Sequence, residues 1–267
     1  MSGDVASTAA RDRFDLTGSV IWVPGGAGAL GSVVSRGLAE HGAHVILAGR
    51  DAERTEARAK HIRSLGLSAE ARVLDVTDEE AVDAQAAAIV DDHGHLDACV
   101  NLAYRSTGKT IDVMTSAEWL EGLQATALGA FLVGRAAGRV LSDGGSLVQF
   151  SSMYGVVSPD PRAYPESQSI NPPDYGFAKA GVLQLVRYQA VQLASRNVRV
   201  NAVVPGAFPG EKPRADAEFI ERLSSRAPLG RVGDPEELVG AVVFLCSRAS
   251  TFVTGTSITV DGGWTAW

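Results

Sequence analysis

Residues 19–31 read SVIWVPGGAGALG, and this stretch decides the fold. A β-rich apolar run (residues 19–23) breaks into a glycine-rich turn (residues 24–31), and a helical apolar pattern follows. Glycines allow a backbone to approach a pyrophosphate closely, and the N–H groups and dipole of the following helix attract it. A glycine-rich loop alone is equally a tight turn, but the strand before it and the helix after it indicate a dinucleotide site.

Short apolar runs rich in β-branched residues recur along the chain and alternate with longer helical patterns. We expect six further strands, at residues 44–48, 71–76, 98–100, 145–150, 198–204 and 257–260, and one long helix at residues 119–140. This rhythm predicts an α/β fold, a Rossmann-type doubly wound parallel β-sheet with helices on both faces. With 267 residues, 45% of them hydrophobic, we expect a single domain over residues 14–267 and a disordered tail over residues 1–13.

Composition and charge exclude several classes of protein. The net charge is −7 and no Lys/Arg cluster is interleaved with aromatics, which argues against nucleic-acid binding and favours a small-molecule substrate. Cys99 and Cys246 each lie in an apolar run, as buried thiols of a reducing compartment do. No apolar run is long enough to span a bilayer, so we expect a cytoplasmic protein without membrane contact.

We expect no metal site. His93 and His95 lie near Asp91 and Asp92, but the segment reads as a loop before a strand and lacks further ligands. A solvated loop is therefore the better interpretation of these residues.

The end of the second expected strand, Gly49-Arg50, bears on the choice of cofactor. In a dinucleotide fold this end lies beside the adenosine ribose, where a carboxylate binds the 2′-hydroxyl and an arginine accommodates a 2′-phosphate. The tip carries Arg50 and no acid, although Asp51 follows, which favours NADP(H) and leaves NAD(H) possible. Arg50 is also acceptable as a solvated turn residue.

Asp75 belongs to the end of the third expected strand, where it could hydrogen-bond an adenine amino group. The alternative is that Asp75 or Thr77 caps the helix that starts at Asp78, and both can hold together. The carboxyl ends of parallel strands meet at one edge of a sheet, which is where such folds bind ligands.

Residues 175–179 read YGFAK and open a long apolar-periodic segment. On a helix, Tyr175 and Lys179 lie on one face. A lysine cation beside a phenol favours the phenolate, so we expect the pKa of Tyr175 to fall toward working pH, which makes it a candidate proton donor and acceptor. Taken alone, the pair is equally typical of an ordinary helix surface.

A Pro-rich insertion, residues 153–174, separates Ser152 from Tyr175 and is long for a loop in a compact domain. Because both its ends adjoin the candidate chemistry, we expect it to select the substrate and to contribute little to stability. Residues 207–225 are charged and interrupted by prolines, as a mobile lid would be.

Together these residues resemble a short-chain dehydrogenase/reductase of the compact, single-domain branch with a YxxxK motif, over about residues 16–263. The resemblance implies that Tyr175 exchanges a proton with the substrate oxygen while a nicotinamide exchanges a hydride with its carbon. It also implies that Ser152 holds that oxygen, and that Lys179 binds the nicotinamide ribose and lowers the tyrosine pKa. The implied activity is NADP(H)-dependent interconversion of a secondary alcohol and a ketone, by a homotetramer or homodimer.

The resemblance also supplies the rest of the expected site. The cofactor-binding residues are Gly25, Ala27, Gly28, Ala29, Leu30, Gly31, Arg50, Asp75, Val76, Asn101, Ala103, Tyr175, Lys179, Pro205 and Gly206. The substrate-binding residues are Ser152, Tyr104, Arg105, Tyr154, Arg162 and Tyr164. The two arginines among them indicate a small polar substrate, sugar-like or anionic.

Four departures from the family pattern keep a second hypothesis open. They are Pro24 and Ala29 in the glycine turn, Tyr104 where the family keeps room, Thr126 in place of the asparagine that helps hold a relay water, and the long insertion. Thr126 is counted here among the catalytic residues. The alternative function is a redox-neutral reaction of epimerase or dehydratase type, or NADP(H) binding with weak turnover. Retention of Ser152, Tyr175 and Lys179 favours an enzyme.

Overall fold

The structure, a computed structural model, describes residues 13–166 and 169–267 and contains one seven-stranded sheet. The strands are β1 (Val20–Pro24), β2 (His44–Gly49), β3 (Ala69–Val73), β4 (Ala98–Asn101), β5 (Ser146–Phe150), β6 (Arg199–Pro205) and β7 (Ser257–Val260). They run parallel in the order β3-β2-β1-β4-β5-β6-β7. The predicted fold class is confirmed. The expected tail falls on residues 1–12, which lie outside the described residues, and the single domain stays a prediction.

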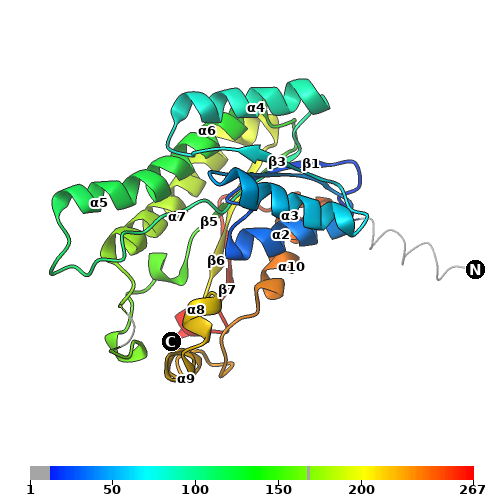
Figure 1. Cartoon of the computed structure of the whole chain (residues 1–267). Helices are drawn as coiled ribbons and strands as arrows, with labels where there is room; N and C mark the ends of the chain where they lie inside the picture. Colours follow the sequence, from blue (N-terminus) through cyan, green and yellow to red (C-terminus); the bar gives the residue numbers. More distant parts are fainter. Residues whose placement is uncertain (1–12, 167–168) are drawn as a thin grey trace, which may run out of the picture.

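Helices cover both faces of the sheet (Figure 1). They are α2 (Ala29–Glu40), α3 (Ala52–Ser64), α4 (Glu79–His93), α5 (Ser116–Leu123), α6 (Gly129–Val140), α7 (Pro173–Leu193), α8 (Glu211–Arg214), α9 (Ala217–Ser224) and α10 (Val239–Cys246). Side chains of α2, α3 and α10 pack on one face, and those of α4, α6 and α7 on the other. No helix in the described ranges 13–166 and 169–267 is long and apolar enough to cross a membrane.

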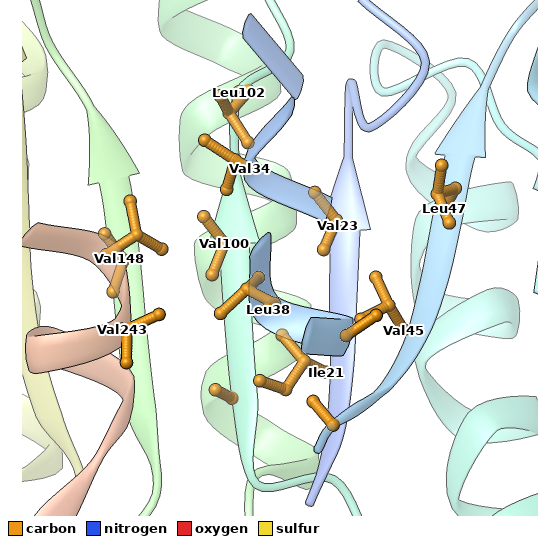
Figure 2. Close-up of a cluster of buried hydrophobic side chains, with 14 of the residues drawn as sticks. Ile21, Val23, Val34, Leu38, Val45, Leu47, Val100, Leu102, Val148 and Val243 are labelled. Atoms are coloured by element: carbon orange, nitrogen blue, oxygen red, sulfur yellow. The ribbon is translucent and has the colours of Figure 1, made fainter. Parts of the chain in front are cut away.

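Strand β1 is apolar along its whole length because both faces of the sheet are covered there. In β1, Ile21 and Val23 enter the core beneath α2 and α10, while Val20 and Trp22 enter the opposite core beneath α4 and α6. Figure 2 shows Ile21 and Val23 among the side chains of the first core. Trp22 is fully buried, and its indole nitrogen donates a hydrogen bond of 3.0 Å to Gln85.

The sheet reverses its direction of growth between β1 and β4. From β1 the chain adds β2 and β3 on one side, and from β4 it adds β5, β6 and β7 on the other. Loops leaving adjacent strands at such a switch point diverge, which leaves a crevice at the carboxyl ends. The glycine turn after β1 and the segment after β4 therefore form the two sides of one site.

Two element boundaries differ from the sequence prediction. β3 ends at Val73, so Asp75 lies in the loop beyond the strand. The helix expected at residues 119–140 is divided, because the π-helical turn Gln124–Leu128 separates α5 from α6. A π-turn inserts one residue into a helix and opens its backbone hydrogen bonds, which apolar periodicity does not reveal.

We predict that Gly31→Ala destabilises the protein by about 1–3 kcal/mol, because overpacking forces a backbone shift. A Cβ on Gly31 would lie 2.1 Å from the carbonyl oxygen of Gly25. The measurement is urea unfolding of the parent and the variant. Gly240→Ala is the matched control, since Gly240 also lies in a helix but a Cβ there meets nothing within 4 Å. The control is expected to be neutral or up to about 1 kcal/mol stabilising, and equal losses in both variants would contradict this account.

Candidate active site

The glycine turn lies directly against the segment that follows β4. The N–H of Gly25 donates to the carbonyl of Ala48 at 2.8 Å, and a Cβ on Gly25 would lie 2.6 Å from the backbone nitrogen of Ala103. Gly25 also has a φ of +81°, a backbone conformation that favours glycine. Helix α2 starts at Ala29 without a side-chain cap, so its first N–H groups remain available for an anion.

A cavity of about 440 Å³ extends from this turn between β1 and β4. It is lined by Gly25, Ala27, Gly28, Ala29, Gly49, Arg50, Arg54, Leu74, Asp75, Val76, Thr77, Leu102, Ala103, Tyr104, Arg105, Glu121, Gln124 and Ala125. Exposed backbone N–H groups at one side and arginines at the other suit a ligand with several phosphates. The lining therefore fits a dinucleotide, with a pyrophosphate at the start of α2.

The far end of the cavity carries Arg50 and Arg54. Asp51, between them, is the N-cap of α3 and accepts the N–H of Arg54 at 2.9 Å. The acid that follows the strand is thus engaged in capping, while both guanidinium groups remain on the cavity. Sequence analysis identified Arg50 but missed Arg54, which lies in the first turn of α3.

Asp75 lines the same end, but its carboxylate is engaged locally. It accepts hydrogen bonds from the N–H of Thr77 at 3.0 Å and its hydroxyl at 2.8 Å, and these bonds lower the pKa of Asp75. The idea that Asp75 or Thr77 caps the next helix is wrong, because Asp78 caps α4 by accepting the N–H of Ala81. The described lining residues that the sequence did not single out also include Glu121 and Gln124, on the helix that follows the segment after β4.

Arg105 is bound through both its side chain and its backbone. It lines the dinucleotide cavity and forms an ion pair of 2.5 Å with Glu121, and its charge contributes to the lowered pKa of Asp75. Its backbone is bound by Thr126, whose hydroxyl donates to the Arg105 carbonyl at 2.8 Å and accepts the Arg105 N–H at 3.2 Å. The role of Arg105 in substrate binding stays a prediction.

Those two bonds give Thr126 a positioning role. Thr126 is buried within the π-helical turn Gln124–Leu128, and its hydroxyl is fully engaged by the loop after β4. A hydroxyl bound in this way positions the loop, because its proton is donated to the Arg105 carbonyl. The catalytic role of Thr126 stays a prediction.

Ser152, Tyr175 and Lys179 meet beyond the carboxyl end of β5. Ser152 precedes a short 3₁₀ turn, and its hydroxyl accepts the N–H of Tyr154 at 3.2 Å and hydrogen-bonds Tyr175. Tyr175 and Lys179 lie one helical turn apart on α7. The ammonium of Lys179, which is 3% exposed, donates to the carbonyl of Phe150 at 2.7 Å. The predicted grouping of these three side chains is present in the structure.

The predicted electrostatics of this group is wrong in direction. Burial raises the pKa of Tyr175 to about 12, and the hydrogen bond from Ser152 opposes that rise only in part. Burial also lowers the pKa of Lys179 to about 7. Desolvation disfavours the charged form of both groups and outweighs the attraction between a cation and a phenolate.

Tyr104 covers the two helical residues. Its ring meets that of Tyr175 edge-on, with centroids 5.7 Å apart, and the Lys179 nitrogen lies 5.6 Å from the Tyr104 ring centre. Tyr104 is 61% exposed. The side chain that replaces the family's glycine thus lies between the dinucleotide cavity and the catalytic group.

The Pro-rich insertion is a packed element along its described part. Ala163 is fully buried, and the hydroxyls of Tyr164 and Tyr154 are 2.6 Å apart. Tyr164 also packs on Phe219 of α9, with ring centroids 5.6 Å apart. The expectation that the insertion contributes little to stability is therefore wrong, since buried apolar surface is stabilising.

Arg162, in the same insertion, faces solvent. Its side chain is 78% exposed and paired with Asp160 at 2.9 Å, and its role in substrate binding stays a prediction. Hydrogen bonds from Arg162, together with the charge of Arg226 at 2.9 Å from Oδ2 of Asp160, lower the pKa of Asp160 to about 2. Residues 167 and 168, within the expected substrate loop, lie outside the described residues.

The remaining expected cofactor residues are not among those that line the cavity. Asn101 accepts the N–H of Ala103 at 3.1 Å and donates to Gln149 at 2.9 Å, so it shapes the loop after β4. A Cβ on Gly206, after Pro205, would lie 2.5 Å from Asp261. Leu30 and Gly31 belong to the first turn of α2.

A doubly wound sheet, a phosphate-compatible glycine turn and a Ser–Tyr–Lys group at one sheet edge define a nucleotide-dependent oxidoreductase of Rossmann type. The family described as enoyl-(acyl carrier protein) reductase matches residues 25–265. The chain belongs to the short-chain dehydrogenase/reductase family and is an NAD(P)-dependent enzyme of that family.

Relatives match over nearly the whole length. The chain is 34% identical over 258 residues to 5-keto-D-gluconate 5-reductase of Escherichia coli strain K12, covering 95% of this chain and 98% of the relative. It is 34% identical over 268 residues to galactitol 2-dehydrogenase of Rhizobium johnstonii, covering 96% and 99%. The structure of a gluconate 5-dehydrogenase from Burkholderia cenocepacia J2315 in complex with NADP and tartrate has a TM-score of 0.86 at 30% identity, covering 97% of this chain and 99% of that chain.

We predict that burial of Lys179 makes stability rise with pH. The folded-state pKa of about 7 lies below the ordinary 10.5, so between these values the unfolded chain binds more protons at this residue. The free-energy cost of burying the charged Lys179 ammonium is present in full at and below about pH 7 and disappears toward pH 10.5. Unfolding of the parent and of Lys179→Met from pH 7 to pH 10 measures it. The parent should gain stability relative to the variant as pH rises, and a flat or falling difference would contradict the assignment.

Proposed function

We propose that this protein is an NADP(H)-dependent dehydrogenase/reductase that interconverts a secondary alcohol and a ketone on a sugar acid or polyol. The observation that carries the proposal is the meeting of Ser152, Tyr175 and Lys179 beside a cavity suited to a dinucleotide. A group of this kind has an acid and a hydrogen-bond donor aimed at one point, which a binding protein does not need.

Each side chain of the group has a separate role. The hydroxyl of Ser152 holds and polarises the substrate oxygen, and Tyr175 exchanges a proton with it. A phenol with a raised pKa is a fully protonated acid at neutral pH, which suits the reduction of a ketone. Bound nicotinamide supplies or accepts the hydride. Lys179, with a pKa near 7, can exchange a proton at working pH.

The lining of the adenosine end favours NADP(H). Arg50 and Arg54 present two guanidinium groups that can bind a 2′-phosphate, while Asp51 is engaged as a helix cap. The related gluconate 5-dehydrogenase from Burkholderia cenocepacia was solved with NADP. Both observations support NADP(H) over NAD(H).

The substrate class rests on the relatives and on the polar groups near Ser152. The relatives are named for 5-keto-D-gluconate, gluconate and galactitol, which are polyhydroxylated molecules with a secondary alcohol or ketone. Arg105 and Arg162 are paired elsewhere, so they no longer argue for an anionic substrate. In the insertion, the backbone N–H of Tyr154 binds the Ser152 hydroxyl, and the hydroxyls of Tyr154 and Tyr164 lie 2.6 Å apart.

The surface of α5, α6 and α7 supports assembly into a homo-oligomer. Four large apolar side chains are exposed there: Leu120 (60%), Phe131 (43%), Phe177 (61%) and Val191 (75%). Trp119 packs on Phe177, with ring centroids 5.3 Å apart. Apolar side chains gathered on one face of a helix pair are typical of an interface. We include a homodimer or homotetramer, located in the cytoplasm, in the proposal.

Tyr175→Phe tests the proposed chemistry, because it removes the transferable proton and little else. We expect kcat for NADPH-dependent reduction of 5-keto-D-gluconate to fall by roughly 10²-fold or more, with the Kd for NADPH unchanged within about threefold. Steady-state kinetics and fluorescence titration measure the two quantities. Tyr188→Phe, on the exposed face of α7, is the control and should keep full activity. A Tyr175→Phe enzyme with more than about a tenth of parental kcat would refute the acid role.

Arg50→Asp tests the cofactor. The change removes a phosphate partner and adds a carboxylate that can bind a ribose 2′-hydroxyl, so the preference should move from NADPH toward NADH. Arg58→Asp, farther along α3 and outside the cavity lining, makes the same charge change and should leave the preference intact. The ratio of the Kd for NADPH to the Kd for NADH measures the preference in each protein. A parent that binds NADH as tightly as NADPH would refute the cofactor assignment.

A further inference from the structure

Three metal-ligating side chains meet at the edge of the sheet away from the cofactor cavity. They are His44 at the start of β2, Glu70 on β3 and His93 at the end of α4, and their ligand atoms lie within 4.8 Å of one another. The sequence placed His93 in a solvated loop. The structure instead shows it as the last residue of α4, brought to its partners by the packing of that helix along the sheet.

The nitrogen of His44 that points into this group is ready to bind a metal. The Nε2 atom is buried without a hydrogen-bond partner, whereas Nδ1 lies 2.6 Å from the hydroxyl of Ser68. A second partner on the far nitrogen fixes the ring and its tautomer, as in known metal sites. Burial and the neighbouring His93 also lower the pKa of His44.

Glu70 completes the set with a carboxylate. One oxygen lies 3.4 Å from Nε2 of His93, and the other lies 3.7 Å from Nε2 of His44. Arg72 also donates to Glu70 at 2.7 Å, but it is shared with Asp92 at 2.8 Å. The two carboxylates and one guanidinium leave a net negative charge around the imidazoles, which favours a cation.

We propose that His44, Glu70 and His93 form a binding site for a divalent transition-metal ion of the Zn²⁺ type. Two imidazoles and one carboxylate suit Zn²⁺ in preference to Mg²⁺, and water completes a tetrahedron. Metal–ligand bonds of about 2.0–2.2 Å require the three side chains to close by roughly 1 Å, which rotamer adjustment of partly exposed groups permits.

This site is separate from the reaction. His44 begins β2 and Gly49 ends it, so five residues of extended strand, about 17 Å, separate the metal ligands from the dinucleotide cavity. A bound ion joins β2, β3 and α4, and its effect is on the stability of this sheet edge.

The test is Zn²⁺ binding to protein first dialysed against EDTA, by calorimetry and thermal unfolding at pH 7.5. We expect one ion per chain, and a Tm rise of about 5 °C at a hundredfold excess over Kd. Mg²⁺ should give neither signal. His44→Gln and His93→Gln should each weaken Zn²⁺ binding at least about tenfold and abolish the Tm rise.

His95→Gln is the matched control, because His95 lies two residues from His93 but pairs with Asp97 outside the group. It should retain parental affinity and Tm rise. Absence of binding to the parent, or equal binding by the His44 and His93 variants and the parent, would overturn the proposal. Because the readouts are affinity and Tm, either result is independent of whether the protein reduces ketones.

Discussion

The close approach of the glycine turn to the segment after β4 is the constraint on which the site depends. Leu102 donates its N–H to the carbonyl of Pro24 at 2.8 Å, and the backbone of Ala103 occupies the space where Gly25 lacks a Cβ. Gly31 meets the carbonyl of Gly25 in the same way from α2. Backbone contact of this kind needs glycine, and it directs both the start of α2 and the loop after β4 into one cavity.

Burial then sets the chemistry of the catalytic group. Lys179 is held below Tyr175 by the carbonyl of Phe150, in surroundings that disfavour its charge. Tyr175 is correspondingly kept as a neutral acid. Thr126 fixes the backbone of Arg105 in the loop after β4. Tyr104, in the same loop, packs its ring against Tyr175. Two of the departures from the family pattern, Tyr104 and Thr126, thus belong to the loop after β4 or bind it.

The sheet and its parallel course could be predicted from sequence because they follow from periodicity, and the shared face of Tyr175 and Lys179 follows from their spacing on one helix. The grouping of Ser152 with them follows from the resemblance to a known family. Arg162 is paired with Asp160, two residues away, and that local pairing could have been considered from the sequence. The direction of Arg105 could not be predicted, since it depends on Glu121, which only the folded chain brings near. The pKa of Tyr175 was misjudged for a related reason. Spacing shows the neighbouring charge, whereas the depth of burial comes from packing.

The most direct test of the account follows the hydrogen that is transferred. The enzyme is incubated with 5-keto-D-gluconate and with NADPH that carries deuterium at the transferable position, and the product is examined by mass spectrometry and NMR. The account predicts an alcohol with one deuterium on the former carbonyl carbon. Tight NADPH binding without deuterium transfer to this substrate or to any ketose in a panel would contradict it, and would favour a redox-neutral enzyme or a binding protein.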